Sequence, residues 1–226
     1  MLLDPISWTD DGWPSARGGD LRRPLAAPAR LASAPTSHAV ALSGDFALEH
    51  LGARCAFYAP DLGYLNRVRF EHGEMILQAQ GDSPADTSPL SFITGDRSYT
   101  FEVDIALEDG AQAGLLLFYD AKLFCGVAAT HDMLHTYKLG QEQGYPPPGA
   151  GVGERLSLRV INHENVASFF IRSAPQAWRR VVSYEVGGYN HNMADGFMSL
   201  RPAIFVAGSG LARFSAVKFE GAPQSA

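Results

Sequence analysis

The stretch that decides the fold is YTFEVDIAL, residues 99–107, in which apolar and polar side chains alternate without a break. Phe101 and Val103 would point to one side of an extended chain and Glu102 and Asp104 to the other, because successive side chains of a β-strand face opposite ways. Such alternation is typical of an antiparallel strand with one face on a core and the other toward solvent. The sequence therefore predicts a half-buried strand over 99–107.

Similar short apolar runs fill the rest of the chain at intervals of roughly 8–12 residues. The 23 glycines and 14 prolines, against 19% charged residues, indicate short strands and tight turns rather than long helices. We expect a hairpin over 68–78 and strands over 99–107, 113–119, 122–128, 134–139, 155–162, 166–172, 178–186, 196–206 and 211–219. Because this region is too long for a small barrel and has no repeat of propeller-blade length, we predict an all-β jelly-roll sandwich of two antiparallel sheets.

The net charge limits the expected partners, and the N-terminal sequence limits the expected cellular location. The 226 residues carry a formal net charge of −6. Nucleic acid and anionic membranes require a clustered Lys/Arg surface, so neither is an expected partner. No stretch approaches the roughly 20 consecutive apolar residues of a membrane span. The start lacks the basic and continuous apolar regions of a signal peptide, which predicts a cytoplasmic location.

Composition divides the chain into three parts. Residues 1–37 begin with two tryptophans and the turn Asp10-Asp11-Gly12, and then become rich in Ala, Pro and Arg. This change indicates a short ordered segment followed by a linker or wrapping arm. Residues 38–220 hold the strands of the sandwich, and residues 221–226 form a tail.

The motifs of common catalytic sites are absent from the sequence, which has no Gly-rich phosphate loop, H-E-x-x-H, G-x-S-x-G or paired C-x-x-C. Glu102, Asp104 and Glu108 form a run of carboxylates similar to that of sandwich glycosidases of the laminarinase type. Glu102 and Glu108 would lie about 20 Å apart along a strand, whereas a retaining pair of carboxyl groups needs about 5–5.5 Å. We therefore interpret these carboxylates as the solvent face of the strand.

Four further side chains are weaker candidates for binding. His131 and His135 lie four residues apart, but a metal site needs a third ligand that the sequence does not identify. We therefore interpret them as polar residues at a strand end, with metal binding as the alternative. Tyr145, in the stiff segment GYPPPG, and Trp178 are candidates for stacking on sugar rings. A packing role is the alternative for both aromatic residues.

Four segments occur in a characteristic order: SFITGDRSY at 91–99, AGLLLFY at 113–119, LSLRV at 156–160 and GFMSLRPAIF at 196–205, the last preceded by YNHN at 189–192. Together they resemble the C-terminal concanavalin-A-like domain of glycoside hydrolase family 43 (GH43) β-xylosidases and α-L-arabinofuranosidases. The segment DPISWTDDGWP at 4–14 is similar to the end of the family's five-bladed catalytic propeller. The resemblance covers nearly the whole chain.

This resemblance implies a concanavalin-A-like sandwich that packs on a catalytic propeller, with residues 1–37 as a propeller-end remnant and linker. In the family the propeller supplies a base Asp, an orienting Asp and an acid Glu, and no position of this chain matches the motifs that carry them. We therefore expect no catalytic residue and no hydrolysis by the chain alone. The expected function is that of an accessory domain in a xylan-degrading hydrolase, and this role predicts an exposed apolar patch on the sandwich.

One loop of the family's sandwich closes part of the substrate pocket. Its counterpart is the segment before the Gly-Phe run, which makes Tyr189, His191, Asn192 and Met193 the candidate pocket residues; an ordinary crossover loop is the alternative. Expected partners are a propeller domain or a second copy of the chain, and a xylo- or arabino-oligosaccharide. No cofactor is expected, although a structural calcium ion stays open. The alternative function is a free-standing, lectin-like module for plant-cell-wall oligosaccharides, which requires a groove lined by exposed aromatic residues.

Overall fold

The computed structural model describes residues 6–16, 44, 46, 51, 55–144, 153–194 and 196–221. The chain forms two compact units, residues 1–36 and residues 37–226, and each is described by itself. No described helix is long enough and apolar enough to cross a membrane.

The first unit contains a small hairpin. Strand β1 (Ile6–Trp8) pairs antiparallel with strand β2 (Pro14–Ala16). Thr9 closes the turn between them, because its hydroxyl donates to the carbonyl oxygen of Trp13 and accepts from the Trp13 amide, both at 3.0 Å. The turn expected at residues 10–12 is therefore present.

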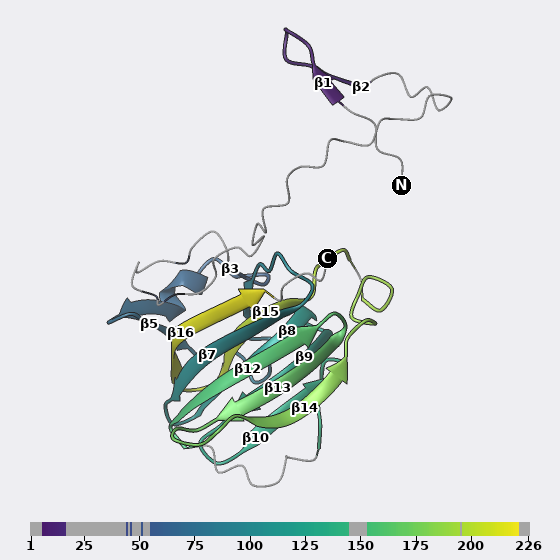
Figure 1. The fold of residues 1–226 in the computed structure, drawn as a ribbon. Coiled ribbons are helices and arrows are strands. Elements are labelled where there is room, and N and C mark those ends of the chain that lie inside the picture. Colours follow the sequence, from purple (N-terminus) through teal and green to yellow (C-terminus); the bar gives the residue numbers. More distant parts are fainter. Residues whose placement is uncertain are drawn as a thin grey trace. The chain divides into compact units, whose positions relative to one another are not determined.

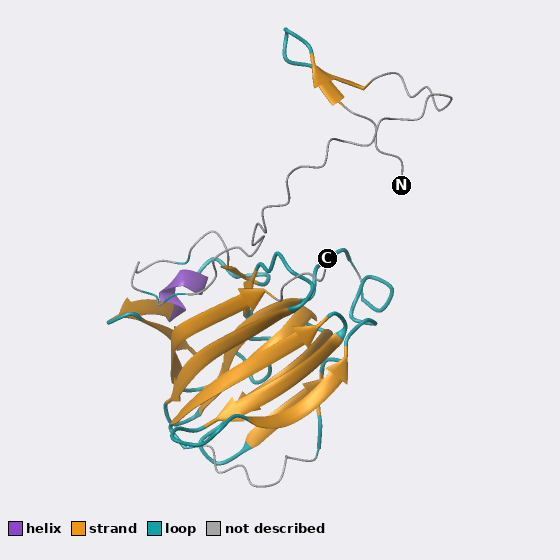
Figure 2. Ribbon diagram, in the orientation of Figure 1, coloured by secondary structure: helices purple, strands orange, loops and turns teal. Residues whose placement is uncertain are grey.

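The second unit consists of two antiparallel sheets of seven strands each (Figures 1 and 2). The first sheet has the order β11-β10-β9-β8-β15-β6-β3 and the second β14-β13-β12-β7-β16-β5-β4. The strands of the first sheet are β3 (Cys55–Phe57), β6 (Leu90–Phe92), β8 (Ala111–Asp120), β9 (Leu123–Ala129), β10 (Leu134–Lys138), β11 (Gln141–Glu142) and β15 (Arg201–Gly208). The strands of the second sheet are β4 (Val68–Glu71), β5 (Glu74–Gln78), β7 (Tyr99–Leu107), β12 (Arg155–His163), β13 (Val166–Arg172), β14 (Arg179–Glu185) and β16 (Leu211–Gly221). The short 3-10 helix η1 (Tyr64–Arg67) precedes β4. The predicted all-β sandwich is confirmed.

Strand β7 occupies the middle of the second sheet, between β12 and β16. Its residues alternate strictly, so that Phe101 and Val103 are fully buried in the core while Glu102 and Asp104 lie on the outer face. The alternation expected for residues 99–107 is thus confirmed with the same bounds. The core that it faces is shared by both sheets.

The central strands of the first sheet, β8, β9 and β15, are buried on both faces. Leu115 and Leu117 of β8 belong to the main core, whereas Leu116 and Phe118 lie in a second apolar cluster on the opposite face. Tyr58 covers part of this cluster and packs edge-on against Phe118, with the ring centroids 5.0 Å apart. Burial on two faces explains why residues 113–119 are apolar without alternation.

The predicted strands differ from the observed bounds by at most two residues, with one exception. The range 196–206 was too long, because β15 begins at Arg201 and residues 196–200 form a loop. Gly196 has φ +118°, a conformation outside the β region that only glycine adopts readily, so the chain is not extended as a β-strand at this position. Strands β3, β6 and β11 were not expected, since two or three residues are too few for a visible alternation.

Strand register brings several loops to one end of the sandwich. Tyr99 at the start of β7 pairs with Asn162 near the end of β12. Val166 at the start of β13 pairs with Glu185 at the end of β14. This end, which we call the loop end, therefore carries the connections 93–98, 164–165 and 186–200.

Candidate interaction site at the loop end

The connection from β14 to β15 is organised by its own polar groups. The side-chain amide of Asn190 donates from Nδ2 to the carbonyl oxygen of Gly187 at 2.8 Å, and its Oδ1 accepts from the backbone amide of Asn192 at 2.9 Å. The backbone amide of Met193 donates to the carbonyl oxygen of Asn190 at 3.0 Å. Asn190 therefore fixes two consecutive turns, as asparagine side chains do in loops.

Tyr189 attaches this connection to the core. Only 5% of the residue is exposed, and its hydroxyl accepts from the backbone amide of Leu139, which follows β10, at 3.0 Å. Burial raises the pKa of the Tyr189 phenol above its usual range. His191, Asn192 and Met193 are exposed instead. Of the four residues predicted for a pocket loop, three therefore reach the surface and the fourth holds the loop in place.

Phe197 is the most exposed large side chain of this loop, with 88% of its surface accessible, and the sequence analysis did not single it out. Its ring stacks on the imidazole of His191, with the ring centroids 4.9 Å apart and an angle of 28° between the planes. Two adjacent large apolar residues after a glycine, Phe197 and Met198, break the alternation of a strand, and this break was the available signal.

A buried tyrosine on the first sheet holds the backbone beside Phe197. The hydroxyl of Tyr119, at the end of β8, donates to the carbonyl oxygen of Gly196 at 2.8 Å and accepts from the amide of Met198 at 3.0 Å. Both backbone partners flank Phe197, so the exposed ring stands on a fixed segment.

Apolar side chains gather at the loop end. Among the described residues ten large apolar side chains are exposed, and six of them lie in the connections or strand ends at this end. These six are Ile93, Leu139, Val166, Met193, Phe197 and Met198. Exposed apolar side chains concentrated in one region are typical of a surface that another molecule covers.

A small cavity of about 250 Å³ lies between the connections of the same end. Its apolar lining comes from Tyr99, Tyr189, Val186 and Leu200. Its polar lining comes from Thr94, Asp96, Arg97, Asn162, Glu164 and Asn165. The cavity is therefore bounded by rings and aliphatic groups on some sides and by hydrogen-bonding groups on others.

Trp178 lies elsewhere, next to the outer face of the second sheet. The guanidinium carbon of Arg159 is 4.0 Å from the centre of its ring, and that of Arg172 is 4.6 Å away. Arg159 in turn forms an ion pair with Glu102, with Nη2 and Oε1 2.6 Å apart. The Trp178 ring is thus in contact with the protein's own cations. Tyr145, the other stacking candidate, lies outside the described residues.

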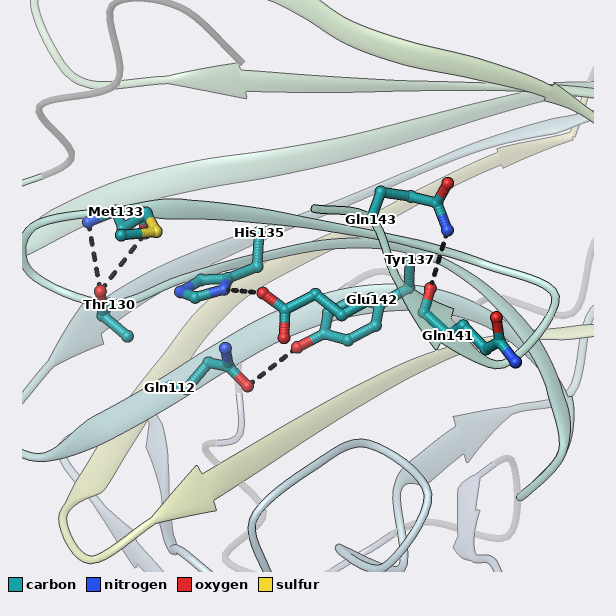
Figure 3. A network of polar contacts seen from close by, with 8 residues as sticks. All are labelled: Gln112, Thr130, Met133, His135, Tyr137, Gln141, Glu142 and Gln143. Carbon is teal, nitrogen blue, oxygen red and sulfur yellow. Dashed lines mark hydrogen bonds and ion pairs between the residues drawn. The ribbon is translucent and has the colours of Figure 1, made fainter. Parts of the chain in front are cut away.

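The histidines singled out by the sequence have separate partners. His131 Nδ1 lies 3.0 Å from Asp109 Oδ1. His135 Nδ1 lies 2.6 Å from Glu142 Oε1, and Figure 3 shows this second pair. Beside the second pair, the hydroxyl of Tyr137 donates to Gln112 at 3.0 Å (Figure 3). Within the described part of the chain no group of three or more His, Cys, Asp or Glu side chains could hold a metal ion.

A second and larger cavity, of about 470 Å³, opens between the edge strands β3 and β4. Its lining is mostly apolar and includes Phe57, Leu65 and Phe70. Its lining residues lie on or beside one edge strand of each sheet. None of them is among the candidate binding residues predicted from the sequence.

Neither a scan of protein-family models nor a search of curated proteins found a match to this sequence. The structure, however, is similar to several solved ones. Xylan beta-1,4-xylosidase from Bacillus halodurans matches 96% of this chain with a TM-score of 0.68 and 16% sequence identity. The GH43 protein BlXynB from Bacillus licheniformis matches 97% of this chain with a TM-score of 0.69 and 16% identity.

The chain spans 46% of the length of each of these two proteins. A protein of unknown function from Saccharomyces cerevisiae matches 75% of this chain and 97% of its own length, with a TM-score of 0.52 and 13% identity. At these identities the likeness shows the fold. The chain therefore has the fold of a part of GH43 glycoside hydrolases, as the sequence resemblance predicted, and a similar fold extends over nearly all of the yeast chain.

Proposed function

We propose that this chain acts as a non-catalytic accessory domain of a GH43-type glycoside hydrolase of the β-xylosidase or α-L-arabinofuranosidase class. In this role the loop end packs on a catalytic propeller, and the segment around Phe197 helps to shape the substrate pocket. The observation that carries the proposal is the exposed Phe197 ring on a segment that Tyr119 fixes from the core. A fixed, exposed aromatic side chain is the kind of residue that dominates protein interfaces.

Two further observations support this role. The apolar side chains of the loop end match the uncovered patch that an accessory domain requires. The structural likeness covers nearly all of this chain but less than half of the GH43 proteins, which supports a role as one part of a larger assembly.

The carboxylates of β7 favour a structural role. Glu102 is engaged by Arg159 through Nε at 2.7 Å and Nη2 at 2.6 Å, in a charge-assisted pair on the outer face of the sheet. Glu108 lies just beyond the other end of β7, where Arg213 approaches it at 3.9 Å. The two carboxylates serve different ion pairs on the sheet surface.

A second candidate is the free-standing, lectin-like module. The yeast protein favours it, because a related sandwich there accounts for nearly the whole chain. Against it, the aromatic row on the outer face of the first sheet, which includes Phe118, Phe124, Tyr137 and Phe205, is buried and offers no open platform. Calorimetry with xylo- and arabino-oligosaccharides decides: no heat at millimolar concentration excludes this candidate.

The proposal is tested by adding the purified chain to a GH43 catalytic propeller produced without its own sandwich. Sedimentation velocity would report the complex, and hydrolysis of nitrophenyl β-xyloside would report its effect on the active site. We expect a 1:1 complex with a lower KM than the propeller alone. Phe197→Asp should abolish the complex, because a charge would be buried in an apolar contact.

Leu62→Asp is the matched control, since Leu62 is apolar and at least as exposed as Phe197 but belongs to the opposite end of the sandwich. It should leave the complex intact. A complex that both variants form as well as the parent chain, or one that only Leu62→Asp disrupts, would contradict docking through the loop end.

A further inference from the structure

Two of the exposed methionines of this chain lie together at the loop end. Among the described residues three methionines are exposed, namely Met133 at 45%, Met193 at 63% and Met198 at 48%. Met193 and Met198 belong to the same connection, from β14 to β15, whereas Met133 lies in the turn between β9 and β10. Met75, in β5, is fully buried. The loop end therefore presents two accessible thioether groups, and the other two methionines serve as an exposed and a buried reference.

The backbone that carries the two thioethers is fixed on either side of the Phe197 ring. The amide of Met193 donates to a carbonyl oxygen of its own connection, and the amide of Met198 donates to the hydroxyl of Tyr119, both at 3.0 Å. Met198 follows Phe197 directly, and Met193 lies two residues after His191, which stacks on Phe197. Both thioethers thus belong to the segment through which the loop end is proposed to dock.

The reference methionine Met133 lies at the other end of the sandwich. Its turn contacts the end of β7, because the Nε2 atom of His131 lies 3.1 Å from the carbonyl oxygen of Leu107. The loop end lies at the start of β7 instead. Met133 is therefore a methionine of similar exposure that docking through the loop end would not cover.

An exposed thioether reacts with hydrogen peroxide to give a sulfoxide. The sulfur attacks one peroxide oxygen, the O–O bond breaks and an S–O bond forms. The leaving hydroxide takes the proton of the transferred oxygen and becomes water. The sulfur loses two electrons and the peroxide gains them, so hydrogen peroxide is the oxidant. The product is polar, and its oxygen accepts hydrogen bonds where the thioether was apolar.

We propose that Met193 and Met198 are sites of reversible sulfoxide formation, and that their oxidation by hydrogen peroxide weakens docking of the loop end. This inference rests on the proposed accessory function and adds a regulation to it. A sulfoxide oxygen enclosed in an apolar contact loses its hydrogen bonds to water without gaining a donor. The dissociation constant of the complex should therefore rise by about tenfold or more. Methionine sulfoxide reductases reverse the oxidation, so treatment with them should restore the affinity.

The first measurement identifies the methionines that react. The purified chain is treated with hydrogen peroxide, and peptide mass spectrometry follows each methionine with and without a GH43 catalytic propeller that lacks its own sandwich. Met193 and Met198 should gain one oxygen atom each, while Met75 stays reduced. The bound propeller should slow both reactions severalfold and leave Met133 unaffected. Oxidation of Met193 and Met198 that is no faster than that of Met75 would overturn the inference.

The second measurement compares the affinity of the reduced and the oxidised chain for the propeller, by titration in sedimentation velocity. In the double variant Met193→Leu/Met198→Leu the dissociation constant should be the same before and after peroxide treatment, because no thioether is left at the loop end. Met133→Leu is the matched control, and it should show the same loss on oxidation as the parent chain. Other oxidised side chains remain in the double variant, so their effect is measured there.

The outcomes separate this inference from the docking proposal. If the reduced chain forms the complex and the oxidised chain binds equally well, the regulation is wrong and the docking proposal stands. The inference also fails if the double variant loses affinity on oxidation as the parent chain does. If the reduced chain forms no complex, the accessory function is contradicted, and its regulation with it.

Discussion

Trp178 and Phe197 are both aromatic residues outside the main core, but they differ in how much of each side chain contacts the rest of the protein. Trp178 is half-buried and in contact with the guanidinium groups of Arg159 and Arg172. Phe197 is almost fully exposed, and its described ring contact is with His191, which is also exposed. The difference teaches that an aromatic residue on a sandwich surface is a candidate for binding a partner when most of its side chain stays exposed, even where one neighbouring ring stacks on it.

The largest effect on stability is expected at Trp178. Trp178→Ala removes two cation–π contacts and uncovers the aliphatic parts of Arg159 and Arg172, and we expect a loss of about 2–3 kcal/mol in the free energy of unfolding. Urea denaturation monitored by circular dichroism would measure it. A loss below about 0.5 kcal/mol would mean that the stack is not a stabilising feature.

A smaller loss is expected when the support of Phe197 is removed. Tyr119→Phe deletes the hydroxyl that binds Gly196 and Met198, and we expect a loss of about 1–2 kcal/mol, because two hydrogen bonds with partial exposure disappear. Hydrogen exchange should accelerate at the Met198 amide. Unchanged exchange at Met198 in this variant would show that other contacts fix the loop.

Phe197 itself should contribute little to folding. Phe197→Ala should change the free energy of unfolding by less than about 0.5 kcal/mol, because the side chain buries almost no surface in the chain alone. The same denaturation experiment measures it beside Trp178→Ala. A loss comparable to that of Trp178→Ala would remove the distinction between the two aromatic residues.

The smallest effect on stability is expected at His131, another side chain with polar partners within the protein. The carbonyl oxygen of Leu107 and then the carboxylates of Asp109, Glu154 and Asp132 raise the pKa of His131 above its ordinary value. Because the folded state favours the protonated imidazole, the contribution to stability is fully present below the ordinary pKa and is lost as the pH rises through the raised pKa.

The comparison of the parent chain with His131→Asn measures this contribution. The stability difference between the two should be larger at about pH 5.5 than at about pH 8.5. A difference that grows with pH instead would mean that the neutral imidazole is the stabilising form.

Most strands of the sandwich could be predicted from the sequence, because each strand shows its own pattern of apolar residues within a few positions. Alternation located β7, and the uninterrupted apolar run at 113–119 located β8. The loop at 196–200 escaped prediction because its conformation depends on Gly196 and on the hydroxyl of Tyr119, which is distant in the sequence. Likewise, the cations that contact Trp178 come from the neighbouring strands β12 and β13, and their proximity arises only when the sheet forms.

Only part of the candidate site could be predicted, because its residues come from segments that are distant in the sequence. The resemblance pointed to the segment 189–193, and the structure places three of its four candidates on the surface. Tyr189 instead has a role in packing, and Phe197 replaces it as the most exposed residue of the loop. The small cavity behind the loop draws on three separate connections, which no local pattern brings together.

The most direct test of the accessory role is the release of nitrophenol from nitrophenyl β-xyloside and nitrophenyl α-L-arabinofuranoside by the purified chain, beside a competent GH43 enzyme. The account predicts no turnover by the chain alone. Clear turnover that a single substitution such as Glu102→Gln abolishes would contradict it, because the sandwich would then have an active site of its own.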